Sequence, residues 1–309
     1  MHLLIPFACS TAAQCRPALA PLQLPYLEKL LRRLAPAPTD AGPATSLTPP
    51  HERVLAQMLG LSAPDGCIAW AAHQVAQAGR NPGSAAWAWI TPVHWDVGAD
   101  HITMADPDAL DLQQAQSREL LSTMQPFFEE DGITLEYAAP QRWLAQGEIF
   151  RNLASASLDR VAGREFSPWM PTAAPLRRLQ NEMQMLLYTH PLNDTRTARG
   201  LTTVNSIWVS GTGALSPARP STGQAVTLAD RLRAAALRND WAQWARSWVA
   251  LDQNECRVLL ESSVAGQPVQ LTLCGERNAL RFESARDGAL NQLRRRFTRT
   301  TLQSLQDQL

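Results

Sequence analysis

The spacing of apolar and polar residues predicts a chain in which helices and strands alternate. Apolar side chains recur at every third or fourth position across 176–188, as on the buried face of an α-helix. A longer amphipathic pattern over 110–128 predicts a second helix. The alternating segment 133–137 follows an Asp-Gly turn and predicts a strand.

Composition and end signals predict the remaining elements. Short strands are expected at 3–8, 87–90, 101–104, 204–209, 269–273 and 279–282. Helices are expected at 25–34 and 52–59, in a Trp-rich stretch after residue 224, and at the end of the chain. Strands interleaved with helices indicate an α/β (mixed α+β) fold, with a layered sheet, flanking helices and a helix-rich C-terminal part.

The Pro-containing segment 216–223 is the best candidate for a linker. It predicts a main α/β domain over 1–215, which holds the candidate ligand site. A helix-rich C-terminal subdomain with a short strand pair would then occupy 224–309. The segment 35–50 is rich in Pro, Ala, Gly and Thr and is predicted to be an exposed loop.

Composition and charge exclude several classes of protein. The 309 residues are 45% hydrophobic and 18% charged, which favours a packed core over disorder. The formal net charge is zero, so nucleic acid and an anionic membrane are not expected as partners. Four arginines of the last predicted helix (Arg294, Arg295, Arg296 and Arg299) are interpreted as a solvated face.

The chain has no apolar run of membrane-spanning length and no convincing secretory signal. Its five cysteines are scattered and form no C-x-x-C pair, as expected for reduced thiols. We therefore expect a cytoplasmic protein.

The strongest candidate site is a polar-rich segment, 190–213. It contains His190, Asn193, Arg196, Asn205 and Ser206, and it ends in Gly211-Thr212-Gly213. We expect Asn193 or Asp194 to cap a short helix whose free N–H groups and dipole favour an anion. Arginine would add a planar, bidentate donor. The alternative is that the same residues only cap a helix, satisfy a turn and face solvent.

Two further clusters could contribute to that site. His94 and His101 lie in a segment rich in aspartate, whose side chains could ligate a metal or share a proton. The spacing matches no zinc or calcium motif, so we expect no metal, no cofactor and a hydrogen-bonded turn or ligand wall. Arg160 and Arg164 could lie beside the main site or form a surface loop with a weak local ion pair.

Other motifs narrow the chemistry. Lys29 is the only lysine, so a phosphate-binding loop of the Walker type is absent, and no Gly-x-Ser-x-Gly elbow occurs. Trp241, Trp244 and Trp248 repeat at helical spacing, which is typical of core packing or of a docking face for another protein.

Several segments together resemble the bacterial RpfE-type family, whose name refers to regulation of pathogenicity factors. The resemblance covers most of the chain and lies at 94–101, 130–135, 142–148, 157–164, 179–193 and 204–213. Members of this family are often labelled cofactor-independent phosphoglycerate mutases. The pattern His-Pro-x-Asn-x-x-Arg-x-x-x-Gly, followed by Asn-x-Ile-Trp, is similar to a segment of archaeal-type, metal-dependent mutases.

The resemblance implies a mutase-like fold and places Asn193, Arg196 and Asn205 on the substrate side. The mutase superfamily needs a nucleophilic serine and two metal ions held by aspartates and histidines. Its ligand motifs do not map onto the six histidines of this chain. The leading hypothesis is a regulatory protein that binds a small anionic ligand without metal-dependent phosphoryl transfer. The alternatives are a divergent mutase or phosphatase that uses residues 94–106, and an interaction protein that uses the Trp-rich part.

Overall fold

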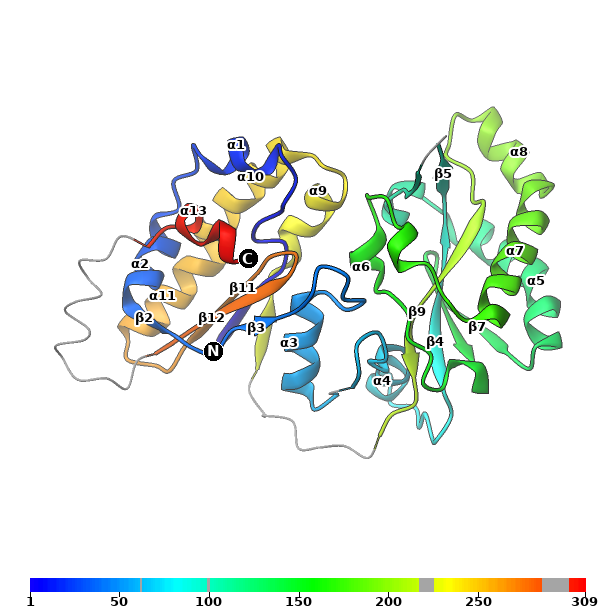
Figure 1. Ribbon diagram of the computed structural model, residues 1–309, viewed down its shortest axis with the longest axis horizontal. Helices are drawn as coiled ribbons and strands as arrows, with labels where there is room; N and C mark the ends of the chain where they lie inside the picture. Colours follow the sequence, from blue (N-terminus) through cyan, green and yellow to red (C-terminus); the bar gives the residue numbers. More distant parts are fainter. Residues whose placement is uncertain (62, 99–100, 217–224, 285–299) are drawn as a thin grey trace. The chain divides into compact units, whose positions relative to one another are not determined.

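The computed structural model describes the whole chain except residues 62, 99–100, 217–224 and 285–299 (Figure 1). The chain forms two compact units. Unit 1 consists of residues 1–44, 49–59 and 220–309, and unit 2 consists of residues 45–48 and 60–219. The fold is mixed α/β, as the sequence predicts.

The division into units differs from the expected split into 1–215 and 224–309. The first strand, β1 (His2–Ile5), pairs in parallel with β10 (Val226–Leu228) on one side. On its other side it pairs in parallel with β11 (Gln270–Cys274). Because β1 lies inside a sheet made mostly by the last third of the chain, the N-terminal segment belongs to the C-terminal unit. Most of the expected linker lies outside the described residues.

The sheet of unit 1 has six strands in the order β10-β1-β11-β12-β2, with β3 also paired to β12. Strand β12 (Asn278–Ser284) is antiparallel to β11, β2 (Leu34–Pro36) and β3 (Asp40–Ala41). The predicted loop at 35–50 therefore contributes two short strands. A proline is tolerated in β2 because that strand lies at the edge of the sheet.

One face of this sheet packs against most helices of unit 1. They are α1 (Cys15–Leu19), α2 (Pro25–Arg33), α9 (Arg233–Leu237), α10 (Trp241–Leu251), α11 (Arg257–Val264) and α13 (Leu302–Leu305). Two short 3-10 helices, η4 (Asp230–Leu232) and η6 (Gln306–Gln308), accompany them, and the π-helical segment η5 (Asp252–Cys256) joins α10 to α11. Trp241, Trp244 and Trp248 of α10 are buried in that core. The Trp-rich part is therefore core, and it does not form the docking face considered as an alternative.

The opposite face of the sheet is covered by α3 (Pro50–Leu59). Val54 on α3 packs with Leu4, Cys274 and Ala279 from the strands, and α3 lies beside β3 (Figure 1). This smaller contact leaves a pocket between α3 and the sheet.

Unit 2 is built on an antiparallel sheet in the order β7-β8-β4-β9. Its strands are β7 (Thr134–Ala139), β8 (Arg142–Gln146), β4 (Trp87–Val93) and β9 (Ser206–Gly213). Helices α5 (Gln114–Glu130) and α7 (Ala174–Tyr188) share a core with one face, and α4 (Trp70–Gln77) packs on the other. Strands β4 and β9 are buried at nearly every position because both faces of the sheet are covered, whereas the edge strand β7 alternates between exposed and partly buried side chains.

Smaller elements complete unit 2. They are the hairpin β5 (Trp95–Val97) and β6 (Ile102–Met104), helices α6 (Leu158–Val161) and α8 (Pro191–Ala198), and the turns η1 (Pro107–Leu110), η2 (Glu148–Phe150) and η3 (Ser167–Trp169). No helix within the described ranges has both the length and the apolar character needed to cross a membrane. The predicted arginine-rich helix at 294–299 lies outside the described residues.

Candidate functional site

The helix expected to bind an anion, α8, is capped differently from the prediction. It begins at Pro191, and its N-cap is His190, whose Nδ1 accepts a hydrogen bond from Leu192 N at 3.2 Å. Asn193 lies inside the helix and is buried. Its amide donates to the carbonyls of Leu187 and Val204 at 2.8 and 2.7 Å and accepts from Val204 N at 2.9 Å. Asn193 thus joins the end of α7 to the segment that leads into β9.

Arg196 is 0% exposed, although its side chain carries a charge. Its Nε donates to Thr202 O at 2.7 Å, one Nη donates to Gln116 Oε1 at 2.8 Å, and the other donates to Leu110 O. Burial lowers the pKa of Arg196, and the nearby Asp111 carboxylate offsets part of that shift. These contacts favour a structural role for Arg196 over the expected role as an anion anchor.

Asn205 and Ser206 also take part in internal hydrogen bonds. The Asn205 amide accepts from Trp95 N at 2.7 Å and donates to Trp95 O at 2.9 Å. Ser206 Oγ accepts from Gln184 at 3.2 Å. Gly211 has a φ of 63°, and a Cβ there would approach the Trp89 ring to 2.8 Å. The glycine-rich turn is therefore the end of β9 packed under a tryptophan, and not a loop that cradles phosphate.

The second cluster lies next to the first, as a shared site would require. His94 Nδ1 lies 2.9 Å from Thr203 O, and its Nε2 lies 3.2 Å from Asp96 Oδ1. His101 is exposed at the tip of the β5–β6 hairpin. Asp106 is buried and accepts from Asp108 N at the start of η1. This arrangement is a hydrogen-bonded turn, one of the two interpretations of the segment.

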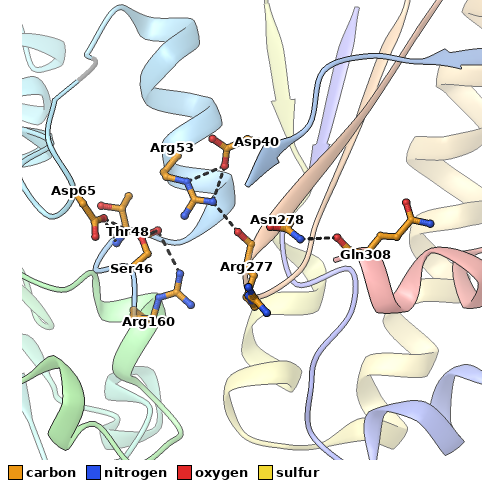
Figure 2. A network of polar contacts seen from close by, with 9 residues as sticks. All are labelled: Asp40, Ser46, Thr48, Arg53, Asp65, Arg160, Arg277, Asn278 and Gln308. Carbon is orange, nitrogen blue, oxygen red and sulfur yellow. Dashed lines mark hydrogen bonds and ion pairs between the residues drawn. The ribbon is translucent and has the colours of Figure 1, made fainter. Parts of the chain in front are cut away.

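The two arginines of the third cluster lie on the other side of the same hairpin. Met104 N donates to Arg164 O at 3.3 Å, and Arg160 is buried on α6. Arg160 donates to Thr48 O at 3.3 Å, and Thr48 N donates to Asp65 at 2.9 Å (Figure 2). The neighbouring Leu47 N also donates to Asp65, at 2.8 Å. Unit 2 therefore brings the three predicted clusters around one hairpin, but their described polar contacts are largely internal.

A pocket of about 530 Å³ lies in unit 1, between the sheet and α3. Its wall includes residues from β1, β3, α3, β11 and β12. They are His2, Pro38, Thr39, Asp40, Val54, Gln57, Met58, Gln270, Thr272, Ala279 and Arg281. None of these residues belongs to the site predicted from the sequence.

Two buried nitrogen atoms of this pocket's wall lack partners. Among the described residues, neither His2 Nδ1 nor Arg281 Nε has a hydrogen-bond partner. The other ring nitrogen of His2, Nε2, lies 2.8 Å from Thr272 Oγ1. His2 is 1% exposed, and burial, followed by the charges of Arg281 and the chain's amino group, lowers its pKa to about 4. His2 is therefore neutral near pH 7. A buried polar group without a partner costs free energy, which a ligand can recover.

An ion pair fixes the rim of the same pocket. Arg53 of α3 lies 2.6 Å from the Asp40 carboxylate of β3 and donates to Arg277 O at 2.8 Å (Figure 2). A Cβ at Gly42 would come within 3.0 Å of the Arg53 guanidinium, so glycine leaves room for it. Asp40, the one acidic residue of the wall, is thus neutralised by Arg53.

No described protein family and no curated protein matches the sequence of this chain. Among solved structures, it is similar to the PH0037 protein from Pyrococcus horikoshii, with a TM-score of 0.43 and 10% identity over 92% of this chain and 87% of that chain. It is also similar to a cofactor-independent phosphoglycerate mutase from Thermoplasma acidophilum DSM 1728. That match has a TM-score of 0.36 and 14% identity, over 100% of this chain and 98% of the mutase.

Proposed function

We propose that this protein binds a small anionic ligand in the unit 1 pocket and acts as a regulatory protein of the RpfE type, without metal-dependent phosphoryl transfer. The observation that carries the binding proposal is Arg281, whose buried Nε lacks a partner among the described residues. Within the described ranges Arg281 has no ion pair, so its charge and planar donors can serve a carboxylate or phosphate. The regulatory part rests on the sequence resemblance alone.

The contrast with Arg196 supports placing the anion in unit 1. Arg196 already donates to three internal oxygens and is inaccessible, so its loss would harm the fold first. Arg281 Nε makes no such bond within the described part of the chain. Replacing Arg281 should therefore remove ligand binding while leaving the fold intact.

The test compares Arg281→Met with the wild type and with Arg246→Met, which removes an exposed arginine of α10 in the same unit. Melting temperatures would be measured in sodium butyrate, phosphate and sulfate against chloride at matched ionic strength. A ligand that binds only the native state raises the melting temperature. We expect at least one anion to stabilise the wild type and Arg246→Met, but not Arg281→Met. Equal stabilisation of all three proteins, or of none, would refute the proposal.

A further inference from the structure

We infer that the unit 1 pocket prefers a monocarboxylate with a short apolar body to a phosphate monoester. This inference rests on the proposed function, because it specifies the anion that the same pocket would take. It follows from the charge, the donors and the apolar surface of the wall.

The charge of the wall fits a single negative charge. Its charged residues are Arg281 and Asp40, and Asp40 is already paired with Arg53. His2 adds no charge near neutral pH, as its buried position implies. A carboxylate would therefore be balanced by Arg281. A phosphate monoester carries between one and two negative charges at neutral pH, so it would leave part of its charge unbalanced in a partly buried site.

The hydrogen-bond donors of the wall also match the two oxygens of a carboxylate better than the three terminal oxygens of a phosphate monoester. Arg281 Nε–H can donate to one carboxylate oxygen. His2 can donate from Nδ1 to the other when the Thr272 hydroxyl donates to His2 Nε2, a geometry that the 2.8 Å separation permits. Phosphate sites in proteins usually add several backbone N–H groups from a helix start or a glycine-rich loop. The described lining residues of this pocket come instead from strands, from the middle and last turn of α3 and from Pro38 and Thr39 of the loop before β3, and they include no helix start and no glycine.

The rest of the wall supplies apolar surface. Val54 and Met58 of α3 face Ala279 of β12 in the small core on this side of the sheet. A ligand with a short alkyl body would bury its methylenes there, and each buried methylene raises affinity about fourfold. Gln57 of α3 is neutral and exposed at the wall, so a charge can be introduced at this position without disturbing the core.

Butyrate and propyl phosphate test this inference because they carry the same three-carbon chain on different head groups. Calorimetric titration at neutral pH should give butyrate an affinity at least about tenfold above propyl phosphate, and about tenfold above acetate. Gln57→Lys adds a positive charge to the wall, so it should improve propyl phosphate more than butyrate. Gln57→Met is the neutral control and should leave the ratio unchanged.

The measured affinities distinguish the preference for a carboxylate from the existence of the anion site itself. If propyl phosphate binds as tightly as butyrate, and Arg281→Met abolishes both, the carboxylate preference is wrong and the anion site stands. If neither probe binds the wild type, or if Arg281→Met leaves both affinities unchanged, the anion site itself is wrong. Circular dichroism of each variant checks the fold, and Gln57→Glu, which should weaken butyrate several-fold, tests the site without altering Arg281.

Discussion

Two regions of this protein contain buried polar side chains, and these side chains differ in whether their donors have hydrogen-bond partners. Around α8 in unit 2, Asn193 and Arg196 give their donors to backbone and amide oxygens of neighbouring segments. In the unit 1 pocket, His2 and Arg281 each keep a buried nitrogen without a partner among the described residues. Satisfied polar groups stabilise a fold, whereas unsatisfied ones in a cavity point to a ligand. Arginine occurs in both regions, so its hydrogen-bond partners, and not its residue type, distinguish a structural joint from a binding site.

The largest effect should come from breaking the joint in unit 2. Arg196→Met keeps the bulk of the side chain but leaves the oxygens of Leu110, Thr202 and Gln116 without their donor. We expect a loss of about 3 kcal/mol or more in the free energy of unfolding, because each buried unsatisfied acceptor costs about 1–3 kcal/mol. Urea denaturation followed by circular dichroism would measure it. A stable variant that had lost anion binding would instead return the ligand site to unit 2.

Asp65 should give the next largest effect. Its carboxylate accepts from Leu47 N, Thr48 N and the Ser46 hydroxyl. Burial raises the pKa of Asp65, but these hydrogen bonds outweigh it and hold the pKa below the usual value. Asp65→Asn presents a donor to one of the N–H groups and should cost about 2 kcal/mol of stability.

The pH dependence of the unfolding free energy gives a second test of the role of Asp65. Because its folded-state pKa is depressed, its contribution is present above the unfolded pKa and is lost as the pH falls through the folded pKa. The stability difference between wild type and Asp65→Asn should therefore shrink on acidification. A difference that does not change between pH 7 and pH 3 would show that ionisation of Asp65 is irrelevant to the fold.

His2 should make the unit 1 sheet sensitive to mild acid. Its pKa is about 4 in the folded protein, against 6.5 for an unperturbed histidine, so the unfolded chain binds a proton first. Stability should fall as the pH drops below 6.5, by at most about 2 kcal/mol between pH 7 and pH 5. His2→Gln lacks the titrating group, so comparing its unfolding free energies with those of the wild type isolates this loss. Parallel pH profiles would exclude His2 as the source.

The smallest effect is expected at His94. Its ring makes hydrogen bonds to Thr203 and Asp96 near the surface, so His94→Ala should cost about 1 kcal/mol of stability. The affinity for butyrate should not change, because His94 belongs to unit 2 and the proposed pocket is formed by unit 1 residues. A clear loss of affinity on this substitution would break the distinction between the two regions.

The sequence predicts elements with strong periodicity and misses those whose existence depends on distant partners. The period of 176–188 agrees with α7, and the apolar run near 204–209 agrees with β9. The Ala-rich helix α4 has a weaker pattern, which does not predict it. Strands β2 and β3 lie in a Pro-rich segment, and their pairing with β12 decides their conformation.

The candidate site illustrates the same limit. Local sequence marks 190–213 as rich in polar residues, several of which are buried in the structure, yet it cannot say whether their donors face a ligand or a carbonyl. Conversely, His2 and Arg281 have no unusual neighbours in the sequence. Strand register brings them to one face of the sheet, since Leu4 pairs with Thr272 and Thr272 pairs with Arg281. The alternation of side chains along a strand can assign His2 and Arg281 each to one face of its own strand. It cannot show that the two strands belong to the same sheet with those faces on the same side.

The hydrogen bond between His2 and Thr272 joins residues 270 positions apart, which has a consequence for synthesis of the protein. On a ribosome that adds about 5–20 residues per second, β1 leaves the exit tunnel tens of seconds before its neighbour β11 exists. The long segment 60–219 of unit 2 is finished well before that time. During the delay the apolar residues of β1 have no sheet to enter, and an unpaired apolar strand is prone to aggregate. Efficient production of this protein should therefore depend on chaperones that hold its first residues until the last third of the chain is made.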